Sequence, residues 1–109
     1  MIRYNIGVIN RHTVEVYKAL ADDVRLGIVK RLACTGEPVS SCDIVASCSD
    51  LLQLSQPAIS HHFGRLVHTG IVIEVKRGKQ KAYILDRNLL SMSGIDIDKV
   101  QYSKKEGIC

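Results

Sequence analysis

The stretch 54–81, LSQPAISHHFGRLVHTGIVIEVKRGKQK, constrains the fold most, because it joins a helix with one polar face to a short pair of strands. Ser55 can cap the helix through its hydroxyl, and Pro57 falls in the first turn, where its missing N–H would have no intrahelical partner. Apolar residues then recur with helical spacing. They are Ile59, Phe63, Leu66 and Val67. The pattern predicts an amphipathic helix whose outer face is short, polar and not acidic.

The residues after this helix predict a β-hairpin. Gly70 stands where a left-handed C-terminal cap is needed, and a strand is expected to start at Ile71. Residues 77–80, Arg-Gly-Lys-Gln, supply the turn chemistry before a return strand over residues 81–85.

The positive charge of the chain is concentrated in this helix and hairpin. Between residues 55 and 85 there are five basic residues and one acidic residue, a local net charge of +4 that equals the formal net charge of the whole chain. The other 10 basic residues balance the other 10 acidic ones. A basic excess confined to one helix and one hairpin is typical of phosphate contact, although exposed lysines can also be merely solvated.

A polar helix face beside a basic hairpin predicts double-stranded DNA as the partner. Gln56 can pair with adenine, and Ser60 and His61 can reach base edges or phosphates. His62 lies nearer the helix edge, where a phosphate contact and a packed role remain alternatives. The residues expected to contact DNA are Ser55, Gln56, Ala58, Ser60, His61, His62, Arg65, Lys76, Arg77, Lys79 and Lys81.

Size and composition predict one cytoplasmic domain over residues 1–109, with loosely ordered segments at 1–9 and 103–109. No apolar run approaches the roughly 20 residues of a membrane span, and the N-terminus lacks the pattern of a signal peptide. The four cysteines form no CxxC pair, so the sequence does not support a zinc ribbon.

Three helices are expected before the basic module. Asn10 can cap the first, Asp22 the second and Ser40 the third, while Gly36 is expected to cap the end of the second helix. A loop over residues 49–54 follows. With a short C-terminal helix added, the fold class is mainly α with a β-hairpin wing, in the element order of a winged helix-turn-helix.

Two segments resemble a known family. Residues 17–26, YKALADDVRL, are similar to the ALADPTRL opening of the ArsR/SmtB-type, or arsenic-repressor, transcription factors, and residues 54–62, LSQPAISHH, to their recognition-helix signature. Tyr83 also stands where this family commonly has tyrosine. The resemblance implies a homodimeric repressor that leaves its operator when it binds a metal, a metalloid or a redox signal.

The inducer sites implied by the resemblance are incomplete. Where arsenite sensors have three cysteines, this chain has Ser40, Cys42 and Val45, and one sulfur is not a soft-metal site. The zinc-site start of the C-terminal helix reads Asp-Arg-Asn, with no histidine after His68. Cys34 and Cys109 roughly fit the layout of sensors of sulfide or oxidation, but Cys34 lies about one helical turn after the usual position, which is occupied here by Lys30. A thiol switch at these two cysteines, without metal or cofactor, is the chemistry that remains. A non-standard metal or metalloid site, with Cys42 or Cys48 as ligand, and a constitutive repressor remain alternatives.

Two apolar surfaces remain for a homodimer seam. They are Val14, Tyr17 and Leu20 in the first helix, and the later segment Leu89, Leu90, Met92 and Ile95. A protein-binding winged-helix module is the competing function, but it has no need of a charged wing tip. An enzyme is not expected, because no nucleophile, base and oxyanion donor occur together.

Overall fold

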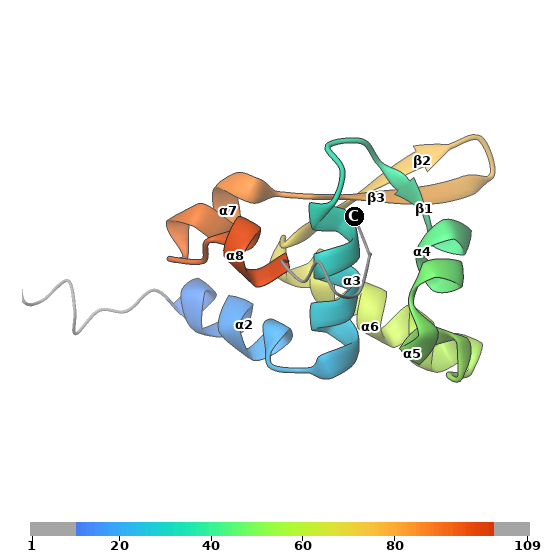
Figure 1. The fold of residues 1–109 in the computed structure, drawn as a ribbon, viewed down its shortest axis with the longest axis horizontal. Helices are drawn as coiled ribbons and strands as arrows, with labels where there is room; N and C mark the ends of the chain where they lie inside the picture. Colours follow the sequence, from blue (N-terminus) through green and yellow to red (C-terminus); the bar gives the residue numbers. More distant parts are fainter. Residues whose placement is uncertain (1–10, 102–109) are drawn as a thin grey trace, which may run out of the picture.

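The computed structural model describes residues 11–101 and shows helices arranged around a small antiparallel sheet (Figure 1). The helices are α2 (Arg11–Leu20), α3 (Asp23–Ala33), α4 (Ser41–Ser47), α5 (Ser49–Leu52), α6 (Gln56–Thr69), α7 (Arg87–Met92) and α8 (Ile97–Gln101), and the strands are β1 (Val39–Ser40), β2 (Val72–Arg77) and β3 (Gln80–Leu85). In Figure 1, α2, α7 and α8 lie at one end of the molecule and the tip of the β2–β3 hairpin lies at the other. The mainly helical fold class with a wing is confirmed.

Side-chain caps define the starts of the helices. Asp22 accepts a hydrogen bond from the backbone N–H of Arg25 at 2.9 Å, and Ser40 accepts one from Asp43 at 3.1 Å, as the sequence predicts. The cap predicted for Asn10 lies outside the described residues. Gly36, by contrast, does not cap α3: the C-cap is Cys34 in right-handed helical geometry, because the chain leaves the helix through backbone bonds back to Arg31 and Leu32.

The connection before α6 is more regular than expected. Residues 49–52 form the short helix α5 instead of a loop, and the backbone N–H of Leu51 bonds to the carbonyl of Cys48. Leu51 is fully buried, so its apolar contacts hold this single turn where local sequence signals do not. The turn between α4 and α6 is therefore itself packed against the core.

Helix α6 begins and ends as the sequence predicts. The Ser55 hydroxyl accepts from the N–H of Ala58 at 3.3 Å, and Pro57 lies in the first turn. Gly70 closes the helix with φ +86°, a left-handed conformation that glycine adopts without a steric penalty.

The wing is a hairpin fastened to a third strand. β2 pairs with β3 in antiparallel register, with Arg77 opposite Gln80, and Gly78 turns the chain with φ +64°. β1 pairs with the other edge of β3, which places Val39 opposite Tyr83. Sequence analysis did not predict β1, because a two-residue strand has no periodicity of its own.

The core lies between α3, α6 and the base of the hairpin. Its largest fully buried side chains are Ile28, Leu32, Ile44, Leu51, Leu66, Ile71, Leu90, Val16, Val29 and Val72. None of the helices described between residues 11 and 101 is long and apolar enough to cross a membrane.

Candidate nucleic-acid interface

Helix α6 presents the polar face that the sequence predicts. Ser55, Gln56, Ser60 and His61 are exposed, whereas Ala58 is half-buried. Arg65, two turns further along than Ala58, is also half-buried. The exposed set is concentrated in the first half of the helix, which is the part of a recognition helix that reaches base edges in the major groove.

The opposite face of α6 fixes its position against the wing. Phe63 and Leu66 are buried, and the Phe63 ring stacks on Tyr83 of β3 with centroids 4.5 Å apart and planes 17° apart. Burial raises the pKa of the Tyr83 phenol, and the nearby carboxylate of Glu74 raises it further. The aromatic pair therefore joins the helix and the hairpin through a contact that stays uncharged at neutral pH.

Cations cover the outer half of the hairpin. Lys76, Arg77, Lys79 and Lys81 are all exposed, and the register sets Lys76 directly opposite Lys81. Side chains on alternate residues share a face of a strand, so this pair lies on the same face as Tyr83, the face that packs on α6. Like charges directly opposite each other destabilise a hairpin, so the arrangement favours an anionic partner.

A groove of about 770 Å³ is lined by residues of α4, α6 and the wing. Ser60 and Gly64 line it from the helix, Glu74 and Lys81 from the hairpin, and Cys42 from α4. A β-carbon built at Gly64 would meet nothing within 4 Å, so the backbone of α6 is bare along this groove.

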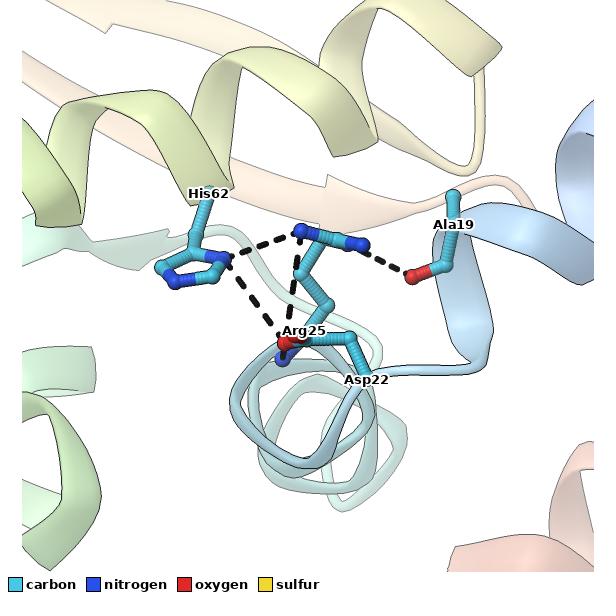
Figure 2. Close-up of polar contacts among 4 residues, drawn as sticks. All are labelled: Ala19, Asp22, Arg25 and His62. Carbon is cyan, nitrogen blue, oxygen red and sulfur yellow. Dashed lines mark hydrogen bonds and ion pairs between the residues drawn. The ribbon is translucent and has the colours of Figure 1, made fainter.

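His62 points toward the corner between α2 and α3 (Figure 2), and its ring centroid is 5.8 Å from that of the exposed His61. Its Nδ1 lies 3.1 Å from Nη1 of Arg25 and 3.7 Å from Oδ2 of Asp22. Burial lowers the pKa of His62; Asp22 opposes this effect, while Arg25 and His61 reinforce it. The His62 side chain is 15% exposed and lies against α3, while its role at DNA stays a prediction.

Sequence analysis did not assign Asp22 and Arg25 to the site. The Arg25 backbone N–H holds the pKa of Asp22 below its usual value, and burial opposes this effect. The signal that could have found these residues is the cap itself, because an arginine three positions after an N-cap aspartate lies beside it.

The cysteines occupy different environments. Cys42 is exposed and free, and Cys48 is free and half-buried, with its thiol pKa raised by burial. Cys34 is half-buried and disulfide-bonded, and its Sγ lies 3.4 Å from the carbonyl oxygen of Lys30. Cys109 lies outside the described residues. Among residues 11–101, no three His, Cys, Asp or Glu side chains are grouped to hold a metal ion.

Comparisons with known proteins agree on one family. The family model described as "Bacterial regulatory protein, arsR family" matches residues 22–74, from the cap of α3 into β2. An arsenical resistance operon repressor of Escherichia coli K12 is 35% identical over 95 residues, covering 87% of this chain and 77% of that protein. The corresponding repressor of Staphylococcus xylosus is 32% identical over 94 residues, covering 86% and 85%.

Solved structures agree with the sequence comparisons. The transcriptional regulator HlyU of Vibrio vulnificus superposes with a TM-score of 0.64 at 27% identity, covering 86% of this chain and 93% of that one. Reduced HlyU of Vibrio cholerae gives a TM-score of 0.60 at 27% identity, covering 77% and 83%. The chain therefore belongs to the arsR family of bacterial regulatory proteins, which are winged-helix transcription regulators and not enzymes.

Proposed function

We propose that this protein is a sequence-specific repressor that reads the major groove with α6 and holds DNA phosphates with the β2–β3 hairpin. The observation that carries the proposal is the pair of exposed lysines, Lys76 and Lys81, set opposite each other on the hairpin face that packs on α6. Their mutual repulsion is relieved when a phosphate binds between or beside them.

Base selectivity comes from the first half of α6. Gln56 can donate to and accept from the edge of adenine, and Ser60 and His61 lie within the next helical turn. Arg65 and the cations of the hairpin position the protein without reading sequence.

A two-fold dimer supplies the second reading head. Of the residues predicted for the seam, Leu90 is fully buried in the core and so is not available to a partner. The two segments adjoin each other, because the Tyr17 hydroxyl of α2 donates to the carbonyl of Ser93, just after α7, at 2.6 Å. Tyr17 is 49% exposed and Met92 83% exposed, an unusual exposure for such large side chains. A two-fold dimer of this kind binds a near-palindromic site with half-sites about 10 base pairs apart or a multiple of that.

The test starts from a pool of random-sequence DNA duplexes, from which the purified protein should enrich a near-palindrome. Gln56→Ala should relax the preference at one base position and cost on the order of 1–3 kcal/mol. Gln53→Ala is the matched control, since Gln53 is also exposed but precedes α6. Recovery of no enriched sequence, or equal weakening of Gln56→Ala on enriched and random duplexes, contradicts base reading by α6.

For the dimer, sedimentation should show two copies at micromolar concentration. A monomer that retains full binding to the enriched duplex contradicts the two-fold arrangement.

We further propose a thiol switch at Cys34 and Cys109 as the inducer response. Cys34 is disulfide-bonded while Cys42 and Cys48 are free, and a solved structure similar to this chain is titled reduced HlyU. In the reduced protein, closing the Cys34 disulfide would pass two electrons to the oxidant and pull on the surface around α7, because Arg87 there donates to the carbonyls of Ala33 and Thr35 on either side of Cys34. A shift at the proposed seam would move the two recognition helices out of register with successive major grooves.

The switch is tested on protein that has first been reduced, by measuring DNA release under oxidant, with and without sulfide, and under arsenite and zinc. Cys34→Ser and Cys109→Ser should abolish release by oxidant or sulfide, and Cys42→Ser, which removes an exposed free thiol, is the control. If the first two variants release DNA as readily as the parent, the thiol switch is wrong. Release by arsenite that depends on Cys42 or Cys48 would instead support a metalloid response, in keeping with the names of the similar arsenical repressors.

A further inference from the structure

Arg25 joins three elements that are separate in sequence. Its Nε donates to the carbonyl of Ala19 near the end of α2 at 2.7 Å, and its Nη1 lies 3.1 Å from Nδ1 of His62 in α6. Nη1 is also 4.0 Å from Oδ2 of Asp22, the N-cap of α3. Figure 2 shows these contacts. The Arg25 side chain is 11% exposed, so they are largely shielded from solvent.

The chemistry of the contact fixes the state of His62. A guanidinium can only donate, so Nδ1 of His62 must accept, which places the ring proton on Nε2 and leaves the imidazole neutral. The side chain of His62 is 15% exposed, and Asp22 is the acidic group that faces it. Arg25 faces it from α3, and His61 acts on it from α6 itself. The burial that lowers the pKa of His62 is consistent with this neutral form.

We propose that His62 is a positioning residue for DNA binding: its neutral ring anchors the recognition helix to Arg25, and its protonation releases that anchor. The inference rests on the proposed function, because it concerns how α6 is aimed and not whether α6 meets DNA. Gln56, Ser60 and His61 belong to the same rigid helix, so a turn of α6 about its axis moves all of them together.

Protonation reverses the partners of the ring. A proton on Nδ1 faces the Arg25 guanidinium at 3.1 Å, where two cations repel, while Asp22 at 3.7 Å offers a carboxylate oxygen. At 3.7 Å the two atoms are too far apart for a hydrogen bond, so the imidazolium must move toward Asp22 to bond. The expected result is a small displacement of α6 relative to α3, without unfolding, because Phe63 and Leu66 stay buried.

The experiment compares three variants on the DNA duplex enriched by the parent, at about pH 8 and about pH 5.5. His62→Ala should lose affinity on the order of tenfold at both pH values. His62→Gln retains an acceptor for Arg25, so it should bind like the parent at high pH. His68→Ala is the matched control, because His68 is an exposed histidine of the same helix.

The pH profile separates positioning from simple stability. The parent should lose affinity at low pH relative to His62→Gln, which should show only the effects of the remaining histidines. His62→Gln retains His61 and the other histidines of the parent. The difference between these two proteins therefore reports His62 alone.

Two results would overturn the inference. One is a His62→Gln profile that follows the parent at every pH. The other is a nitrogen NMR spectrum of the parent in which the His62 ring carries its proton on Nδ1 at high pH; this measurement needs no variant and no DNA. A parent that enriches no duplex would contradict the proposed function instead, so the two failures are distinguishable.

Discussion

Replacing Lys81 by alanine is expected to weaken DNA binding without weakening the fold. Lys81 is exposed and lies opposite Lys76, so its removal relieves a like-charge pair. Cross-strand pairs contribute roughly 0.2–1 kcal/mol, and solvent exposure places this one at the lower end of that range. Thermal unfolding should therefore show a Tm equal to or slightly above that of the parent.

The loss in affinity follows from counterion release. Each phosphate contact makes the slope of log affinity against log salt more negative by about 0.9. When salt rises from about 50 to 200 mM, the factor by which the variant loses affinity should therefore be about 3.5-fold smaller than the factor for the parent. Fluorescence anisotropy on the enriched duplex and on a scrambled duplex of equal length should show the same change in slope, because phosphate contacts carry no sequence information.

Lys99→Ala is the matched control. Lys99 is an exposed lysine of α8, at the end of the molecule opposite the hairpin tip (Figure 1), so its removal should leave the slope unchanged. A parental slope in the double variant Lys79→Ala, Lys81→Ala would remove the wing from the interface. A loss confined to the enriched duplex would assign Lys81 to base reading instead.

Three further outcomes follow from the packing. Gly27→Ala in α3 and Gly64→Ala in α6 should each raise the free energy of unfolding by about 0.8–1.0 kcal/mol, since neither added Cβ meets an atom within 4 Å. Gly64 lines the groove beside the wing, so of these two variants only Gly64→Ala should also weaken DNA binding. Asp22→Ala should cost about 0.5–2 kcal/mol at neutral pH. Because the folded-state pKa of Asp22 is lowered, its contribution to the free energy of unfolding is present above pH 3.8 and disappears as the pH falls below that value. In an acid titration monitored by circular dichroism, the stability of the variant should therefore fall less steeply with pH than that of the parent. Tyr17→Phe should lower stability by about 1 kcal/mol in denaturant titration, because it removes the hydrogen bond to Ser93.

The helix ends that the sequence predicts are those fixed by neighbours within a few residues. Ser55 caps α6 through a residue three positions later, and Gly70 ends it through its own backbone freedom. Gly36 has the same composition signal, yet α3 already ends at Cys34, because a terminating glycine only permits a left-handed turn and does not require one.

The features that sequence analysis missed depend on contacts between distant residues. β1 forms because Val39 lies opposite Tyr83, and nothing in a two-residue segment indicates that pairing. The contact between Arg25 and His62 spans 37 positions along the chain. Local patterns could identify the exposed face of α6 and the charged hairpin, but not the side chains that hold the helix from behind.

The hairpin is held at its base in three directions. Tyr83 pairs with Val39 of β1 on one side and with Glu74 of β2 on the other, and its ring stacks on Phe63 below. Beyond Ala82 the two strands continue with exposed side chains as far as Gly78. The hairpin is therefore fixed by packing at its base only, and its cations lie on the outer part, where the exposed side chains leave it easier to bend. The wing can therefore bend to follow variation in the width of a DNA groove while the direction of α6 stays fixed.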